Sequence, residues 1–147
     1  MKKIMIVDDD AVSLSICKAY LANEYEVLLM SSAVQALGYF KQGNTPDLIL
    51  LDIYMPGMDG FAFLDQLREN EKWKKLPVIL MSSGDGYQTI QEGYEHGAND
   101  YLVKPINPVI VMKKIQVWLE YQRVLLENQT LRSQLDLIRQ ILGTTSL

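Results

Sequence analysis

The sequence contains very little cysteine and histidine, which limits the metal and redox chemistry that it can support. Among its 147 residues there is one cysteine, Cys17, and one histidine, His96. A lone cysteine cannot form an intrachain disulfide, and one cysteine with one histidine cannot make a multi-ligand site for a soft metal. We therefore expect a reducing, cytoplasmic location, and we expect any bound metal to be held by oxygen atoms.

Clustered positive charge and long apolar runs are also missing. Fourteen lysine and arginine residues against eighteen aspartate and glutamate residues give a formal net charge of -4. A surface that binds nucleic acid needs clustered lysine and arginine, and a membrane span needs about 18 consecutive apolar residues. We therefore expect no direct contact with nucleic acid and no membrane partner. With 48% hydrophobic and 22% charged residues, the composition is typical of a folded domain with a packed core.

The sequence does contain an alternation of short apolar runs with segments of helical spacing. Leu14, Cys17 and Leu21, at positions i, i+3 and i+7, are typical of one such helix. Three of the runs lack polar alternation, as expected for parallel strands that helices cover on both faces. The five runs, read as strands, are residues 3–7, 25–30, 46–52, 77–82 and 100–103. Because strands and helices alternate through short connections, the sequence predicts a doubly wound α/β fold with a parallel sheet.

The last helix is predicted to be unusually long. Asn107 supplies a capping side chain, Pro108 suits the first helical position, and Gly143 marks the end. A helix from Pro108 to Leu142 would be about 52 Å long at 1.5 Å per residue, whereas a domain of roughly 120 residues has a radius of gyration of about 13 to 14 Å. We therefore expect this helix to project beyond the domain.

Residues that can carry chemistry stand at the carboxyl ends of the predicted strands, where open α/β sheets bind their ligands. One such residue alone is usually a turn or capping residue, but several in order predict a common site. They are Asp8, Asp9, Asp10, Asp52, Ser82 and Lys104. For Asp10 we favour a capping role at the start of the first helix, and for His96 we favour a helix-end cation or a solvated residue over a metal ligand.

The segments that contain the strand-end residues, IMIVDDD, DLILLDIYMPGMDG, PVILMSS and GANDYLVKP, resemble the receiver domain of two-component response regulators. The match extends from residue 1 to about residue 121, with a spacing of 30 residues from Asp52 to Ser82 and 22 from Ser82 to Lys104. The resemblance implies a flavodoxin-like sheet of five parallel strands in the order 2-1-3-4-5. It divides the chain into a receiver domain, residues 1–121, and a helical extension, residues 122–147.

The resemblance also implies a role for each of these side chains. Asp52 would accept a phosphoryl group from a histidine kinase or a phosphotransfer protein. Lys104 and Ser82 would contact the phosphoryl oxygens, and Tyr101 together with Ser82 would act as the conformational switch. The chain would catalyse only its own phosphorylation and dephosphorylation, so it would be a signalling phosphoacceptor and not an ordinary enzyme.

A divalent metal follows from the charge of this site. The three carboxylates of Asp8, Asp9 and Asp52 and the one ammonium group of Lys104 sum to a formal charge of -2. Mg²⁺ prefers oxygen ligands and readily serves phosphoryl groups. The resemblance implies that Mg²⁺, or Mn²⁺ in its place, is held by Asp8, Asp9, Asp52 and the backbone carbonyl of Tyr54. It also implies a cis peptide bond directly after Lys104.

Two other functions remain open at this point. Aspartyl-nucleophile phosphatases also combine aspartate, lysine and Mg²⁺, but they usually show D-x-D at the nucleophile, whereas Asp52 is followed by Ile53 and Tyr54. A dimeric adaptor could use the fold without phosphorylation, although the presence of Asp52, Ser82 and Lys104 argues against it. The sequence leaves open the cognate kinase, the output, and whether the chain is a single-domain regulator or the N-terminal part of a longer protein.

The helical extension has a heptad pattern. Asn128 in an otherwise apolar seam is typical of a parallel two-stranded coiled coil in one register. We therefore predict a homodimer through this helix; the alternatives are a helix that folds back on its own domain and a contact with a further domain. The seam has Val117, Val124, Leu131 and Ile138 at d positions, and Tyr121, Asn128, Leu135 and Leu142 at a positions.

Overall fold

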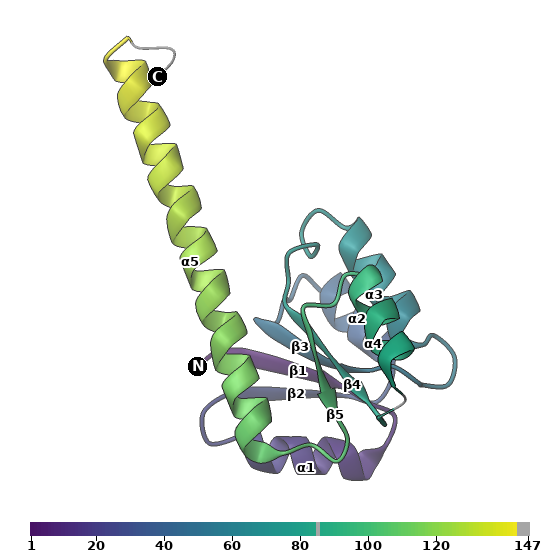
Figure 1. Cartoon of the computed structure of the whole chain (residues 1–147). Helices are drawn as coiled ribbons and strands as arrows, with labels where there is room; N and C mark the ends of the chain where they lie inside the picture. Colours follow the sequence, from purple (N-terminus) through teal and green to yellow (C-terminus); the bar gives the residue numbers. More distant parts are fainter. Residues whose placement is uncertain (85, 144–147) are drawn as a thin grey trace.

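Five parallel strands form the centre of the protein (Figure 1). The computed structural model describes residues 1–84 and 86–143. The strands are β1 (Lys3–Val7), β2 (Glu26–Met30), β3 (Leu48–Asp52), β4 (Val78–Ser82) and β5 (Asp100–Val103), and they lie in the order β2-β1-β3-β4-β5. This arrangement confirms the predicted flavodoxin-like fold. Every strand ends at the predicted residue, while three begin one or two residues later than the apolar runs.

The described helices are α1 (Ala11–Leu21), α2 (Ala33–Lys41), α3 (Gly60–Glu69), α4 (Tyr87–Glu95) and α5 (Pro108–Ile141). Except for α4, whose N-cap is Gly86, the described helices begin where a capping side chain accepts hydrogen bonds from free backbone N–H groups. Asp10 accepts hydrogen bonds from the Val12 N–H and the Ser13 hydroxyl, which confirms its predicted capping role at α1. Asn107 caps α5 in the same way, by accepting from two backbone N–H groups.

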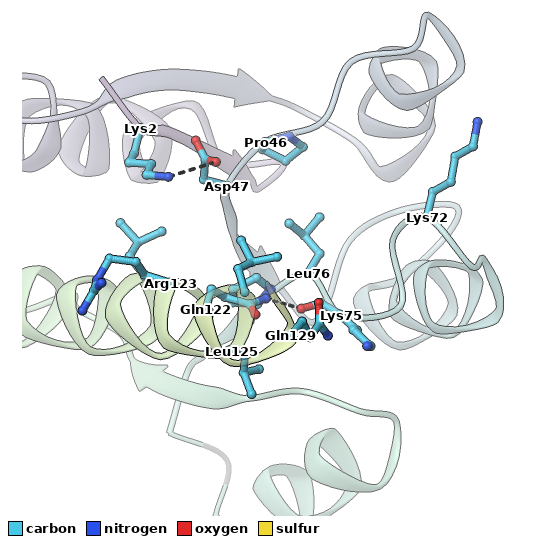
Figure 2. Close-up of a pocket in the computed structure, with 13 residues that line it drawn as sticks. Lys2, Pro46, Asp47, Lys72, Lys75, Leu76, Gln122, Arg123, Leu125 and Gln129 are labelled. Atoms are coloured by element: carbon cyan, nitrogen blue, oxygen red, sulfur yellow. Dashed lines mark hydrogen bonds and ion pairs between the residues drawn. The ribbon is translucent and has the colours of Figure 1, made fainter. Parts of the chain in front are cut away.

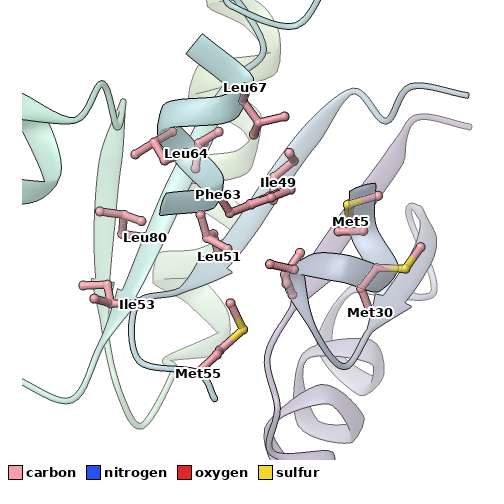
Figure 3. Packing of buried hydrophobic residues seen from close by; sticks show 14 of the residues in the cluster. Met5, Met30, Ile49, Leu51, Ile53, Met55, Phe63, Leu64, Leu67 and Leu80 are labelled. Atoms are coloured by element: carbon pink, nitrogen blue, oxygen red, sulfur yellow. The ribbon is translucent and has the colours of Figure 1, made fainter. Parts of the chain in front are cut away.

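Helices cover the sheet on both faces, and alternate residues of the strands pack into two separate hydrophobic cores. On one face Met5 and Ile49 pack with Phe63 of α3 and with α2 (Figure 3). On the other face Ile4 packs with α1 and α5, and Cys17 lies in this core. Because β1, β3 and β4 are buried on both sides, the polar residues at their carboxyl ends are held on a rigid support.

Helix α5 leaves the domain and continues as a single projecting rod (Figure 1). Its buried residues are Val111 and Ile115, and it ends one residue before the predicted Leu142, which forms its C-cap. Among residues 1–84 and 86–143, the segment of α5 after Leu125 is almost entirely exposed, so the helix does not fold back on its own domain. Within the same residues, no helix is both long and apolar enough to cross a lipid bilayer.

Candidate functional site

Three carboxylates meet at the carboxyl edge of the sheet. β1 pairs directly with β3, and Val7 lies opposite Leu51, so the residues that follow these two positions are neighbours. One carboxylate oxygen from each of Asp8, Asp9 and Asp52 lies within 4.8 Å of the others. Asp8 and Asp52 are buried, whereas Asp9 is exposed. The structure therefore brings together the three acidic residues that the sequence placed at strand ends.

Lys104 completes this cluster from the end of β5. Its Nζ atom donates a hydrogen bond of 2.7 Å to Asp8 Oδ2 and lies 3.4 Å from Asp52 Oδ1. Its backbone N–H donates to the carbonyl of Ser82 at 2.7 Å, which ties the lysine to the end of β4. The peptide bond between Lys104 and Pro105 is cis, as the resemblance implied.

The charges in this cluster perturb one another. Burial, followed by the nearby charge of Asp8, raises the pKa of Asp52 to about 6, although Lys104 acts in the opposite direction. Burial alone would lower the pKa of Lys104, but its contacts with Asp8 and Asp52 outweigh this effect and raise it. The site thus carries more negative charge than its single ammonium group can balance.

The donor set fits a hard divalent cation. Carboxylate oxygens are the ligands that Mg²⁺ prefers, and one exposed carboxylate, Asp9, leaves the cluster open toward solvent, where Mg²⁺ can keep some of its waters. Tyr54, whose carbonyl was the fourth predicted ligand, follows β3 in the loop before α3, and its side chain is exposed. Mn²⁺ takes the same kind of ligand.

The loop before α3 is held against Asp52 by a glycine. The N–H of Gly60 donates to the carbonyl of Ile53 at 2.8 Å. A Cβ atom at residue 60 would lie only 2.4 Å from the backbone oxygen of Asp52. Gly60 is therefore the residue type that allows the start of α3 to approach the strand end so closely.

Ser82 and Tyr101 lie on the two strands beyond Asp52. Met81 pairs with Asp52 in the sheet, and the buried Ser82 follows it directly. The Ser82 Oγ atom accepts from the Gly84 N–H at 3.2 Å, which leaves its own O–H able to donate. Tyr101 is half-buried on β5, and its ring packs edge-on against Tyr94 of α4 at a centroid distance of 6.3 Å.

A second polar cluster lies between β5 and α5, next to Tyr101, and no pattern in the sequence indicated it. Lys114 of α5 donates to Asp100 Oδ1 at 2.9 Å and to the carbonyl of Tyr101 at 2.6 Å. The indole N–H of Trp118 donates to Asp100 Oδ2 at 3.0 Å. Lys114 and Trp118 lie four residues apart on one helix face, but only the tertiary fold places that face against the start of β5.

A cavity elsewhere on the molecule is not part of this site. It has a volume of about 340 Å³ and lies where α5 leaves the domain, lined by residues such as Lys2, Asp47, Lys75 and Gln122 (Figure 2). Lys2 and Asp47 precede β1 and β3, so the cavity opens at the amino edge of the sheet, opposite the aspartates. Gln122 crosses it to donate a hydrogen bond to the carbonyl of Lys75.

Comparison with known sequences points to one family. A family model described as the response regulator receiver domain matches residues 4–116. The response regulator PleD of Caulobacter vibrioides is 34% identical over 124 residues, which are 84% of this chain and 27% of PleD. The two-component response regulator ARR14 of Arabidopsis thaliana is 42% identical over 108 residues, 72% of this chain and 28% of that protein. The chain thus spans little more than a quarter of the length of these two relatives.

Solved structures agree with this assignment. A response regulator from Chloroflexus aurantiacus is 30% identical, with a TM-score of 0.77 over 81% of this chain and 98% of that one. The chemotaxis protein CheY4 of Vibrio cholerae is 32% identical, with a TM-score of 0.73 over 79% of this chain and 97% of that one. NtrX of Brucella abortus is 26% identical, with a TM-score of 0.82 over 89% of this chain and 30% of that one.

Proposed function

Because the chain belongs to the response regulator receiver domain family, we propose that Asp52 accepts a phosphoryl group from a histidine kinase or a phosphotransfer protein in a Mg²⁺-dependent reaction. The observation that supports this proposal best is the position of Asp52, with Asp8 and Asp9 oxygens within 4.8 Å and the Lys104 ammonium group at 3.4 Å. The reducing cytoplasm, where such kinases present their phosphohistidine, suits a chain whose one cysteine is free and buried.

The transfer requires an ionised Asp52. With a pKa of about 6, its carboxyl group is about nine-tenths ionised at pH 7. One carboxylate oxygen attacks the phosphorus, a P–O bond forms, the P–N bond of the phosphohistidine breaks, and the imidazole leaves with the electron pair. Lys104 pairs with one phosphoryl oxygen and the Ser82 hydroxyl donates to another.

The metal would be held by the chain's oxygen atoms. Asp8, Asp9, Asp52 and the backbone carbonyl of Tyr54 would bind Mg²⁺ or Mn²⁺, with Asp8 acting mainly through water. When bound, the ion supplies positive charge that stabilises the anionic phosphoryl group. Asp8 already accepts from Lys104, so the same carboxylate orients the ammonium group next to Asp52.

Mass spectrometry of the intact protein tests this proposal. Incubation with acetyl phosphate and Mg²⁺ should add one phosphoryl group, about 80 Da, and chelation of the metal with EDTA should prevent the gain. Asp52→Ala should gain no mass, whereas the control Asp136→Ala, at an exposed aspartate of α5, should gain the full mass. An unmodified wild-type protein, or equal modification of Asp52→Ala, would contradict the proposal. Catalytic release of phosphate from a phosphomonoester would instead favour the phosphatase alternative.

We also propose that the helical extension predicted at residues 122–147, of which 144–147 lie outside the described residues, joins a second copy of the chain through a parallel coiled coil of its described part. The seam residues Val124, Leu131, Leu135 and Ile138 are apolar and are each at least 40% exposed. At 100° per residue, these four seam residues lie on average about 170° around α5 from Val111 and Ile115, which hold the helix to its domain. A second helix can therefore cover the seam without displacing the first from the sheet.

The polar contacts of the extension are compatible with this arrangement. Glu127, a g position, lies 3.0 Å from Arg123 of its own helix. Such an exposed pair contributes little to stability, so exchanging it for a contact between two chains costs little. Asn128 would face its counterpart in the seam and select two strands in one register.

A further inference from the structure

The cluster beside Tyr101 connects β5 to α5 through polar contacts from one helix face. The Lys114 ammonium group touches β5 in three ways: through Asp100 Oδ1, through the Tyr101 carbonyl, and over the Tyr101 ring at 4.6 Å from its centroid. Trp118 holds the second oxygen of Asp100. Both carboxylate oxygens of Asp100 are thus bound by residues of α5.

These contacts are strong enough to influence the ionisation of Asp100. Burial acts to raise the pKa of this carboxyl group, but the hydrogen bonds from Lys114, Trp118 and the Tyr101 N–H outweigh burial and lower it. Asp100 is therefore a carboxylate at neutral pH, and it keeps the ammonium group of Lys114 in place by charge as well as by hydrogen bonding.

The strand that Lys114 and Trp118 contact, β5, ends next to the phosphoacceptor site. β5 has four residues, with Asp100 at one end and Lys104 immediately after the other. Lys104 touches Asp8 and Asp52. β5 is also an edge strand that pairs only with β4 among the described strands (Figure 1). A movement of Lys104 toward a new phosphoryl oxygen therefore pulls on a short strand that is free on one side.

The apolar attachment of α5 to the domain lies within residues 111–119 of the described part of the helix. Among the described residues of this helix, Val111 and Ile115 are the ones fully buried. The polar contacts through Lys114 and Trp118 begin three residues beyond Val111 and so constrain the direction in which the helix leaves. From Trp118 to Ile141 the helix extends about 35 Å, and a tilt of about 10° at Trp118 would move its far end by about 6 Å.

We propose that Asp100, Lys114 and Trp118 are positioning residues that pass the phosphorylation state of Asp52 from β5 to α5 and so set the direction of the projecting helix. This inference rests on the proposed phosphorylation of Asp52. Phosphorylation displaces Lys104 and, with it, β5. Lys114 then loses its three contacts with Asp100 and Tyr101, and the environment of the Trp118 indole changes. These contacts shift the equilibrium between two arrangements of α5 and take no part in the transfer of the phosphoryl group.

Fluorescence of a single tryptophan tests the link. The chain has two tryptophans, so Trp73→Phe leaves Trp118 as the sole reporter in the parent protein. Acetyl phosphate with Mg²⁺ should shift the emission of Trp118 in this parent. The shift should be lost in Lys114→Met, retained in Lys114→Arg, which keeps the charge and the donors, and retained in the matched control Lys113→Met. Lys113 is exposed and makes no ion pair within residues 1–84 and 86–143.

Intact mass, measured on the same samples, separates failure of the link from failure of the phosphorylation. If the parent and Lys114→Met both gain about 80 Da and only the parent shifts, the link holds. If both gain the mass and both shift equally, or if the parent gains the mass without a shift, the link is wrong. If the parent gains no mass, the proposed function fails and the link fails with it. Asp100→Asn, which keeps the shape of the side chain, replaces Lys114→Met should the latter not fold, and it should also lose the shift.

Discussion

His96 illustrates how much a single side chain depends on its tertiary surroundings. It forms the C-cap of α4, as its position before Gly97 predicted. Its ring stacks on Phe61 at 4.8 Å, and its Nδ1 atom lies 2.6 Å from Asp65 Oδ1. The hydrogen bond with Asp65 raises the pKa of His96 above its ordinary value, with smaller contributions from Glu92 and Asp59, while burial opposes the rise. When protonated, the ring forms an ion pair with Asp65 that ties α4 to α3.

This contact makes stability depend on pH. Since the folded-state pKa of His96 lies above the ordinary value of 6.5, its stabilising contribution is fully present below about pH 6.5 and is lost as the pH rises through the folded-state value. His96→Gln should therefore reduce the free energy of unfolding more at about pH 6 than at about pH 9, by on the order of 1 kcal/mol or less because both partners are partly exposed. Urea denaturation at the two pH values measures this.

The pairing partner supplies the control for that measurement. Asp65→Asn removes the charge that His96 faces across the α3–α4 contact. In this background, His96→Gln should cost nearly the same free energy at both pH values. A difference that persists without the Asp65 charge, or one that is absent from the wild type, would show that the contact does not control this pH dependence.

Arg68 organises the elements around α3. Its Nε atom donates to the carbonyl of Gly97 at 2.9 Å, its Nη1 to that of Leu76 at 2.8 Å, and its Nη2 to Asn99 Oδ1 at 3.0 Å. The carbonyls of Trp73 and Lys74 lie within reach of the same Nη1. One guanidinium group thus joins α3, the turn before β4, and the segment between α4 and β5.

Removal of this group should destabilise the domain without touching the phosphoacceptor site. Arg68→Met should lower the free energy of unfolding by about 3 kcal/mol, because several partly buried carbonyls lose their donors. Arg68→Lys should restore only part of the loss, since one ammonium group cannot reproduce the separate bonds that the guanidinium group makes to Gly97, Leu76 and Asn99. Lys74→Met, which removes a surface ion pair with Glu71, should cost less than about 0.5 kcal/mol. Denaturant unfolding of the variants measures the difference, and equal losses for Arg68→Met and Lys74→Met would contradict this role.

The strands and the primary site could be predicted from sequence because each depends on local pattern. Apolar runs locate the strands, and polar residues that follow them must gather at one edge of a parallel sheet. The predicted strands at 46–52 and 77–82 began too early because Pro46 and Pro77 have no N–H to donate to the sheet, so β3 and β4 begin after them. The structure now places Asp8, Asp52 and Lys104 in contact as the strand ends required.

The contacts that escaped prediction join residues of different helices, strands and connecting segments. Arg68 reaches residues about 30 positions away, and His96 meets Asp65 across 31 positions. Asn99, between α4 and β5, accepts from Arg68 and from the Val78 N–H. Such contacts depend on how helices pack against the sheet, and helical spacing alone does not define which residue of another element lies opposite.

The molecule as a whole is a small receiver joined to a long, exposed rod. The rod exposes apolar side chains to solvent: Leu131, Leu135 and Ile138 are each about half exposed. A row of such side chains on one face of a helix favours a partner that buries them. In the proposed dimer the two receivers would lie on the outer sides of the coil. Because the two α5 helices would pack together, a change in the direction of α5 in one copy would either be resisted by the other helix or move that helix with it.

Light scattering coupled to size-exclusion chromatography tests the dimer with a matched pair of leucines. Leu131 lies in the seam and Leu137 lies outside it, yet their exposed fractions are 55% and 56%. Leu131→Asp should convert a dimer to a monomer, because it buries two carboxylates against each other, whereas Leu137→Asp should leave the dimer intact.

Asn128→Val should keep the chains associated but admit other oligomers, since it removes the polar pair that selects two strands. A monomeric parent at about 100 μM would overturn the coil, because a Kd above this concentration corresponds to an association free energy weaker than about 5.5 kcal/mol. Dissociation by Leu137→Asp alone would place the interface on the opposite face of α5.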